Sequence, residues 1–405
     1  MLKIISCAGY GNTGSSIITD YFQEFSCITS LAGSKFEFTL LHENDGIRDL
    51  EYALLEGNRL KTDLAIKRFL QLVHMLNCQN PSGPNYKDFF NGKFLEYVHD
   101  YIKSLGIITW QYGWWHRIFE CKPEKKILRY VMTDRFNREV RKCGYDLYEP
   151  DAWRPSFTNY TEEFYCFISR ENFINRTKYF LNKLFLEIAG DTEYVFIDQL
   201  FPANVNSGYL KYFDFAKVII VDRDPRDLYF ANKVFWGSGY IPSENVKTFV
   251  NWFKMTRKCA EKEKDILHIN FEDMVYEPEK TQEKICEFTG LNKRYHDKPK
   301  THLFIEKSRT NTMFYENTLL TDSSYEDKLK QDITYIETEL KDHLFPFENY
   351  AYSKNKKTVS FIFEQKLKNL KKQENLIFFP EIIFVLAKKC MCYLLNKYFK
   401  KREVA

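Results

Sequence analysis

The sequence predicts an α/β fold: a doubly wound parallel sheet flanked by helices, with a helical insertion. Three observations support this prediction. The apolar segment 2–8 runs into a Gly-rich turn and then into apolar residues at helical spacing from Ile17 onward. The β-branched run 216–221 is bounded by charged residues, as buried strands often are. Strand and helix patterns also alternate along the chain, which is typical of a parallel sheet covered on both faces.

The other predicted elements follow from the same patterns. Residues 193–198 and 265–269 are further strand candidates. A helix that carries Phe249 and Phe253 is expected between the strand candidates 216–221 and 265–269. Residues 160–190 have the spacing of an amphipathic helix. The span 46–150 is rich in Leu, Phe, Tyr, Lys and Arg at helical spacing, so we expect a mostly helical insertion, broken near Pro81.

The composition divides the chain into a main domain, 1–350, and a basic tail, 351–405. Residues 354–372 of the tail are Lys-rich, and an apolar run follows from Leu376. Glu381 and Lys388 interrupt this run, which makes it a poor membrane span. Two interpretations stay open: a basic amphipathic helix that contacts a membrane surface through 354–400, or a terminal helix packed on its own domain.

Bulk composition excludes several classes of protein. With 44% hydrophobic and 17% aromatic residues, the chain is not intrinsically disordered. A net charge of +4 is too small to indicate nucleic-acid binding, and we expect none. The ten Cys form no C-x-x-C pair and indicate neither a zinc site nor a disulfide scaffold. No basic, apolar leader precedes the Gly-rich turn, so we expect a cytoplasmic protein, peripheral to the inner face of the membrane if the tail binds there.

The Gly-rich turn is a candidate phosphate-binding loop of the P-loop type. Its backbone N–H groups and the start of the following helix favour an anion, and its hydroxyls add donors. The pattern nearly fits G-x-x-x-x-G-K-[ST], but Ser15 stands where nucleoside triphosphatases place a Lys, which argues against an ordinary ATPase or kinase. The predicted cofactor-binding residues of the loop are Gly11, Asn12, Thr13, Gly14, Ser15 and Ser16.

A second anion site is predicted where the strand 216–221 ends. Arg223 follows the carboxyl end of this strand, which is where open α/β sheets bind ligands, and a guanidinium suits a phosphate dianion. Asp224 before Pro225 has the pattern of a helix N-cap with Pro at the first helical position. Asp227 in the first turn suits the helix dipole. A capping device alone would explain both Asp residues but not Arg223.

Together these two segments resemble the family of sulfotransferases that use 3′-phosphoadenosine-5′-phosphosulfate (PAPS), in particular its bacterial, carbohydrate-type branch. In that family a strand–loop–helix binds the 5′-phosphosulfate and a strand ending in R-[DN]-P-[RK]-D binds the 3′-phosphate. The segments 269–275 and 285–291 with Pro278 resemble the family's "YEDLV…P…I…FLGL" pattern. Residues 307–311 resemble its late loop over the cofactor. The resemblance covers 1–20 and roughly 194–312.

The resemblance implies PAPS as the sulfuryl donor, no metal, and further cofactor-binding residues. Ser308 and Asn311 belong to the late loop. The family's Ser, eight residues after the motif Arg, is replaced here by Ala231, and the neighbouring Asn232 is predicted as a substitute donor. The first loop carries Asn12 where relatives often have a Lys or Arg.

Sulfuryl transfer to a hydroxyl needs a general base, and the sequence offers two main candidates. Glu37 lies where the heparan-type branch has its catalytic Glu. Asp198 lies where the cytosolic branch has a Lys and a His before "LP"; no His is present there, which disfavours a His base. The alternative for each carboxylate is a solvated surface group. His42 and Glu43 lie just beyond Glu37.

The acceptor is predicted to be a glycan or a lipid-linked glycan, bound by the helical insertion. Trp110, Tyr112, Trp114, Trp115 and His116 form an aromatic cluster in the sequence that could stack on sugar rings or pack in a core. Two other functions stay open: a P-loop nucleotide kinase or nucleoside triphosphatase, and a protein with the PAPS-binding fold that does not catalyse transfer.

Overall fold

The structure is a computed structural model of the whole chain. It describes residues 2–31, 36–80, 83–112, 161–237, 239–258, 263–319, 323–350 and 357–358. The predicted tail, 351–405, lies outside this part of the chain apart from Lys357 and Thr358, and so do Trp114, Trp115 and His116. Their predicted roles stay predictions. None of the helices in the described residues combines the length and hydropathy that a transmembrane segment needs.

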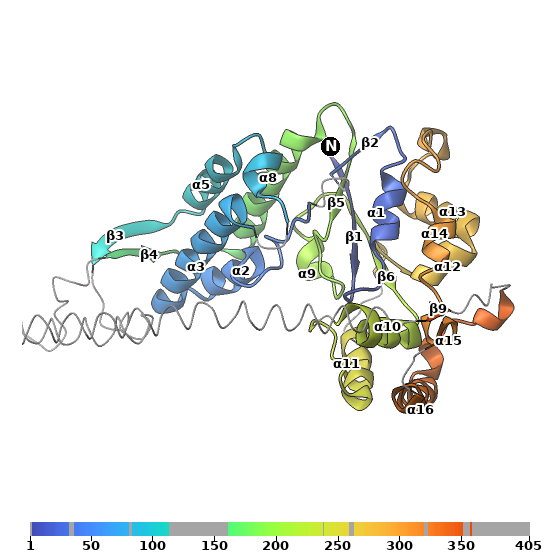
Figure 1. Cartoon of the computed structure of the whole chain (residues 1–405). Coiled ribbons are helices and arrows are strands. Elements are labelled where there is room, and N and C mark those ends of the chain that lie inside the picture. Colours follow the sequence, from blue (N-terminus) through green and yellow to red (C-terminus); the bar gives the residue numbers. More distant parts are fainter. Residues whose placement is uncertain are drawn as a thin grey trace, which may run out of the picture.

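A five-stranded sheet forms the centre of the fold, in the order β2-β5-β1-β6-β7 (Figure 1). All four pairs of neighbouring strands are parallel, so the predicted doubly wound sheet is confirmed. The first strand of the chain is therefore the middle strand of the sheet. The strands are β1 (Lys3–Gly9), β2 (Ile28–Ser30), β5 (Tyr194–Asp198), β6 (Ala216–Asp222) and β7 (Ile266–Asn270).

Alternating side chains on the central strands build two separate cores. Ile4 and Ala8 of β1 pack with one cluster of buried residues, whereas Ile5 and Cys7 pack with another. Both faces of the strand are apolar because both faces of the sheet are covered, which explains the nearly continuous apolar runs in the sequence.

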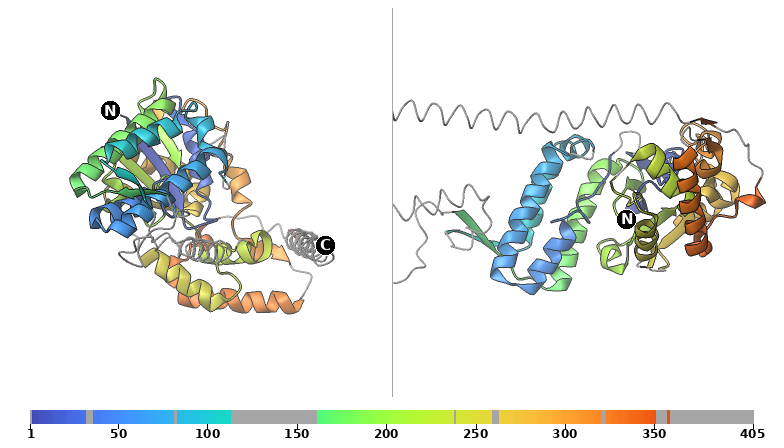
Figure 2. Two further views of the ribbon diagram at one scale, coloured as in Figure 1. Left: turned by 90° about the vertical axis from the view of Figure 1, so that its left-hand side faces the viewer. Right: turned by 60° about the horizontal axis from the view of Figure 1, so that its bottom comes forward.

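Long helices cover the first face of the sheet. They pack through buried aromatic residues such as Phe69, Phe94 and Phe180, and they face the viewer in the left-hand view of Figure 2. The helices on this side are α2 (Ile47–Glu56), α3 (Arg59–Cys78), α4 (Tyr86–Phe89), α5 (Phe94–Ser104) and α8 (Arg170–Ala189), and the short α9 (Ser207–Leu210) follows β5.

Shorter helices cover the second face. Ile17, Tyr21 and Phe22 of the first helix pack against Met274 and Ile285. These helices are α1 (Ser16–Phe22), α12 (Phe271–Tyr276), α13 (Pro278–Thr289) and α14 (Ile305–Arg309).

A third cluster lies beyond the carboxyl end of β6 (Figure 1). Leu228, Phe249 and Ile336 are buried within it. It comprises α10 (Pro225–Ala231), a π-helical turn η3 (Asn232–Trp236), α11 (Val246–Lys258), α15 (Phe314–Asn317) and α16 (Ser323–Glu339). Two short strands, β8 (Thr318–Leu319) and β9 (Lys357–Thr358), pair with each other.

The span 46–150 differs in part from the expected helical insertion. Its described residues contain helices up to Ser104, but β3 (Ile108–Tyr112) is a strand and pairs antiparallel with β4 (Thr161–Tyr165). The described part of the span is thus mostly helical, as expected, and β3 is the exception, because Trp110 and Tyr112 suit a strand as well as an amphipathic helix. The predicted helix 160–190 is correspondingly shorter and begins at Arg170. The proposed domain boundaries stay a prediction.

Candidate active site

The loop between β1 and α1 has the backbone shape of an anion-binding turn. Gly11, Asn12 and Gly14 all have positive φ, at 90°, 53° and 87°. Successive residues of this kind direct backbone N–H groups toward one concavity. Glycine is needed at Gly14 for a second reason, because a Cβ there would lie 2.5 Å from the ring of Phe271.

The backbone donors of this loop have no acceptor among the residues that the structure describes. Among the described residues, no hydrogen-bond acceptor meets the backbone N–H groups of residues 11–16. The hydroxyl of Thr13 is buried and also lacks a partner. Ser16 and Asn12 are exposed, and Ser15 accepts a bond of 3.4 Å from Gln199 Nε2. Unused donors in a Gly-shaped concavity fit an anionic group such as a phosphate.

Arg223 lies beside this loop, at the carboxyl end of β6. Its side chain is only 3% exposed. One guanidinium nitrogen donates to the carbonyl of Asn12 at 3.4 Å, and another donates to the carbonyl of Asn311. The guanidinium carbon lies 5.1–5.4 Å from the ring centres of Trp236, Phe271 and Phe314. The structure thus brings together the two predicted anion sites and the predicted late loop.

The predicted capping role of Asp224 is confirmed, and Pro225 occupies the first turn of α10. Asp224 also accepts hydrogen bonds from Arg226 and from the backbone N–H of Phe345. Asp222 accepts two bonds from Arg257, at 2.6 and 3.0 Å. These pairs hold the charged turn 222–227 in place from several directions.

Asp227 does more than complement the helix dipole, which was the predicted role. Its carboxylate is fully buried and accepts the backbone N–H groups of Met313 (2.5 Å) and Phe314 (2.6 Å). Met313 has a φ of 55°, so the chain turns sharply where Asp227 holds it. Asp227 therefore fastens the end of the late loop to α10.

Buried acids surround Arg223. Burial raises the pKa of Asp227 to about 7. Burial, with the charge of Asp224, raises the pKa of Glu272 well above its usual range. One oxygen of Glu272 and the Nε of Arg223 are both buried without a hydrogen-bond partner among the described residues. The region therefore keeps a cation next to acids that hold protons more tightly than usual.

The predicted cofactor residues of the late loop differ in position. Ser308 lies half-buried in α14, whereas Asn311 is exposed. Asn311 contacts Arg223 through its backbone carbonyl rather than its side chain. Thr312 is buried and pairs with the hydroxyl of Tyr276 at 2.8 Å.

Asn232, the predicted substitute donor, starts the π-helical turn after α10 and is fully buried. Its side-chain nitrogen donates to Ser243 Oγ at 2.6 Å and to the carbonyl of Ile241 at 3.2 Å. Its side-chain oxygen accepts a 3.4 Å bond from Asn12. In this arrangement Asn232 contacts the phosphate loop through Asn12.

The two candidate bases lie side by side. Glu37 forms an isolated parallel bridge with Asp198, which ends β5 next to β1. Asp198 is within 3.3 Å of Cys7 Sγ and 3.5 Å of Thr19 Oγ1. Burial raises the pKa of both carboxyl groups, and the charge of Asp198 raises that of Glu37 further.

Gln199, next to Asp198, is held on three sides. Its N–H donates to the carbonyl of Cys7 at 3.1 Å, and its carbonyl accepts a 2.8 Å bond from His42 Nε2. Its side chain reaches Ser15, and its φ of 54° is unusual for a residue other than Gly. Gln199 therefore links the carboxylates to the phosphate loop.

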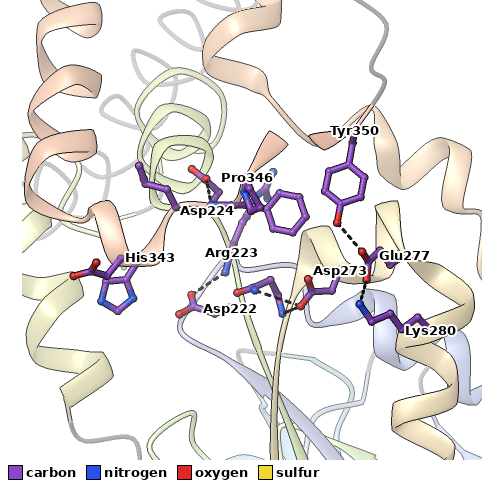
Figure 3. Close-up of a pocket in the computed structure, with 13 residues that line it drawn as sticks. Asp222, Arg223, Asp224, Asp273, Glu277, Lys280, His343, Pro346 and Tyr350 are labelled. Carbon is purple, nitrogen blue, oxygen red and sulfur yellow. Dashed lines mark hydrogen bonds and ion pairs between the residues drawn. The ribbon is translucent and has the colours of Figure 1, made fainter. Parts of the chain in front are cut away.

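A polar cavity of about 380 Å³ opens beside the charged turn, and Figure 3 shows its lining. Several of its carboxylates have partners, among them Asp222 with Arg257, and Glu277 with Lys280 and Tyr350. Of the residues predicted to bind a cofactor, only Arg223 lines this cavity.

Sequence reasoning did not single out several residues at the site. The half-buried pair Asp222–Arg257 and the backbone bonds of Asp227 join segments far apart in the chain, so no local pattern predicts them. Arg309, whose Nε is buried without a partner in the described residues, lies in the late-loop segment. Its position within 307–311, the segment that resembles the late loop, is the sequence feature that could have indicated a role at the site.

Comparison with known families finds a similarity in the middle part of the chain. Residues 177–297, which contain β5, β6 with the charged turn, and β7, match the model of the sulfotransferase family. This part of the chain is therefore similar to the sulfotransferase family, in agreement with the resemblance found in the sequence. The phosphate loop lies outside the matched residues, and the bacterial, carbohydrate-type branch stays a prediction.

Two solved structures show a weaker similarity. One is the sulfotransferase domain of the Synechococcus PCC 7002 olefin synthase, with 12% identity, 87% of this chain and 95% of that chain covered, and a TM-score of 0.31. The other is retinol dehydratase in complex with androsterone and the inactive cofactor PAP, with 12% identity, coverage of 86% and 84%, and a TM-score of 0.24. No curated protein matches the chain. The similarity to sulfotransferases therefore rests on the family model and on residues 177–297.

Proposed function

We propose that the protein transfers a sulfuryl group from PAPS to a hydroxyl of an acceptor. One observation carries this proposal: a loop of unused backbone donors lies next to a buried arginine, whose guanidinium is 3.4 Å from the loop carbonyl of Asn12. A nucleotide with phosphates on both its 5′ and 3′ positions needs two neighbouring anion sites of this kind. A simple nucleoside triphosphate site would need only the loop.

For the predicted cofactor-binding residues, the proposal includes the following roles. The backbone of residues 11–16 and the hydroxyl of Thr13 would hold the 5′-phosphosulfate, and Arg223 would hold the 3′-phosphate. Asn232 would support the loop through Asn12. The late loop, with Ser308 and Asn311, would close over the nucleotide because Arg223 and Asp227 fix its end.

The transfer itself needs a proton acceptor but no redox step. The oxygen of the acceptor hydroxyl forms a bond to sulfur while the bond between sulfur and the bridging phosphate oxygen breaks. The hydroxyl proton passes to a carboxylate of the Glu37–Asp198 pair, and adenosine 3′,5′-bisphosphate leaves. Backbone donors of the phosphate loop would stabilise the charge that develops on the leaving phosphate.

For the acceptor, we propose a glycan or a lipid-linked glycan. The aromatic residues of β3 and its neighbours, including Trp110, suit stacking on sugar rings. Membrane contact through 354–400 and a place at the inner face of the membrane belong to the same proposal. Activity on small phenols but on no glycan would contradict it.

A thermal-shift experiment tests donor binding. Adenosine 3′,5′-bisphosphate should stabilise the protein, by about 2.7 kcal/mol at 100 times its Kd, and Mg-ATP and AMP should not. Arg223→Ala should lose the shift, and Arg223→Lys should keep part of it. Arg294→Ala, which removes an exposed arginine, should behave like the unaltered protein.

Two outcomes would contradict the proposal. Selective stabilisation by Mg-ATP would favour a kinase or nucleoside triphosphatase. A bisphosphate shift of equal size in Arg223→Ala and Arg294→Ala would show that Arg223 binds no phosphate.

A further inference from the structure

Three side chains form one row across the edge of the sheet next to the phosphate loop. Cys7 of β1 is in register with Asp198 of β5, and Asp198 is in register with Glu37 on its other side. The bridge is closed by a 3.1 Å hydrogen bond from the N–H of Phe38 to the carbonyl of Asp198. Residues in register on neighbouring strands project to the same face of a sheet. Both carboxylates therefore lie on the face that carries Cys7 and α1.

The two carboxylates have different surroundings. Asp198 is tied down: one oxygen lies 3.3 Å from Cys7 Sγ and the other 3.5 Å from Thr19 Oγ1. The thiol and the hydroxyl also lie 3.6 and 3.5 Å from the carbonyl of Ser15. Glu37 is half-buried, and its carboxylate has no hydrogen bond or ion pair among the described residues; only its backbone carbonyl is bonded, by Tyr86. The carboxylate of Asp198 therefore already has partners within the fold, whereas the carboxylate of Glu37 is available to accept a proton.

We propose that the two carboxylates have different roles: Glu37 accepts the proton of the acceptor hydroxyl, and Asp198 is a positioning residue that acts through Glu37. This inference rests on the proposed function, and it chooses between the two candidate bases. The proton moves from the hydroxyl oxygen to a carboxylate oxygen of Glu37 as the new sulfur–oxygen bond forms.

Electrostatics supports this division. Burial raises the pKa of Glu37, and the neighbouring Asp198 raises it further, because two adjacent carboxylates resist carrying two negative charges. No described group nearby supplies a compensating positive charge. Burial raises the pKa of the Cys7 thiol and lowers that of His42, while burial raises the pKa of Tyr86 to about 12. These three groups are therefore uncharged near neutral pH. Lys35, a basic residue two positions before Glu37 in the sequence, lies outside the described residues.

The experiment measures the titration of Glu37 directly. In the full chain with ¹³C-labelled glutamate, the resonance lost in Glu37→Gln identifies the carboxyl group. Its midpoint should fall by about one pH unit in Asp198→Asn, since an uncharged amide replaces the carboxylate. Thr19→Val should lower it by less, because losing the hydroxyl disfavours ionised Asp198. Asp265→Asn, a matched control that removes a carboxylate paired with Lys217, should leave it unchanged.

Activity gives a second readout. Glu37→Gln should reduce kcat at least 100-fold. Asp198→Asn should retain transfer and shift the acid limb of the pH profile downward with the Glu37 midpoint. Neither variant should change the thermal shift caused by adenosine 3′,5′-bisphosphate.

Several outcomes would overturn the inference. An unchanged Glu37 midpoint in Asp198→Asn would show that Asp198 does not influence the titration of Glu37. If that variant does not fold, an unchanged midpoint in Thr19→Val would show the same. Full turnover of Glu37→Gln beside an inactive Asp198→Asn would reverse the roles. Failure of the proposed function looks different: the bisphosphate would then cause no thermal shift in the unaltered protein, whatever the titration shows.

Discussion

The phosphate loop and the charged turn 222–227 lie next to each other but are built on opposite principles. The loop is shaped by the backbone, with three positive φ angles, and its donors have no partners among the described residues. The turn is shaped by charges, since Asp224 and Asp227 each accept hydrogen bonds from segments far along the chain. One half of the candidate site is thus left open, whereas the other half is already occupied by the protein's own groups.

This difference separates two kinds of dependence on sequence. In the loop, side chains matter mainly by their size, because the backbone makes the contacts. In the turn, each charged side chain fastens another segment, such as Arg223 with Asn12 and Asn311. A substitution in the loop should therefore change ligand binding first. A substitution in the turn should change stability and binding together.

Gly14→Ala should have the largest effect on the loop. A Cβ there would meet the ring of Phe271 at 2.5 Å, and the φ of 87° disfavours any side chain. We expect affinity for adenosine 3′,5′-bisphosphate, measured by calorimetry, to fall at least 100-fold. Gly92→Ala is the matched control, since its φ is 74° but no atom lies within 4 Å of the added carbon. It should lose only about 1–2 kcal/mol of stability. Equal affinities in the two variants would refute the steric argument.

Asp227→Asn should have an intermediate effect that depends on pH. The ordinary pKa of the carboxyl is 3.8, and burial raises it to about 7 in the folded protein. The folded state therefore binds the proton more tightly, so this group's contribution to stability is present at low pH and is lost as pH rises through about 7. Urea unfolding at pH 5 and at pH 8 measures this loss. Between the two pH values, the free energy of unfolding should fall less in Asp227→Asn than in the unaltered protein, by roughly 1 kcal/mol or more.

The control for this prediction is Asp342→Asn, which removes an exposed carboxylate. It should lose as much stability between the two pH values as the unaltered protein does. If Asp227→Asn behaves in the same way, the buried carboxylate does not titrate as described.

Thr13→Val should have the smallest effect and should separate binding from stability. The Thr13 hydroxyl is buried without a hydrogen-bond partner in the described part of the chain, so replacing it by a methyl group should leave the unfolding free energy unchanged or slightly higher. Affinity for the bisphosphate should nevertheless fall several-fold, because a donor to the phosphate is lost. Thr334→Val on an exposed helix position should change neither affinity nor, by more than about 0.5 kcal/mol, stability. A destabilised Thr13→Val with unchanged affinity would indicate a structural hydroxyl instead.

The sequence was most informative where function depends on local pattern. The Gly-rich loop, the strand before Arg223 and the Asp224 cap are all contiguous signals, and the structure has each of them. Contacts between distant segments could not be predicted in this way. The bond from Phe314 to Asp227 spans 87 positions, and it uses a backbone N–H that every residue but proline possesses.

The candidate bases show the same limit. Glu37 and Asp198 were found separately, by their order along the chain. That they are neighbours depends on a bridge between Glu37 and the end of β5, which no spacing in the sequence reveals. The strand β3 was missed because aromatic residues favour strands and buried helices alike.

The central position of β1 has a consequence for how the protein is made. Its two partners, β5 and β6, begin at Tyr194 and Ala216, so the strand that leads into the phosphate loop has no neighbour until about half of the chain has been synthesised. At about 5–20 residues per second, the ribosome needs on the order of ten seconds or more to supply them. During that time an apolar segment stays without its sheet, a situation in which chaperones commonly protect nascent chains. The site's assembly from both halves of the chain thus makes its completion a late event in biosynthesis.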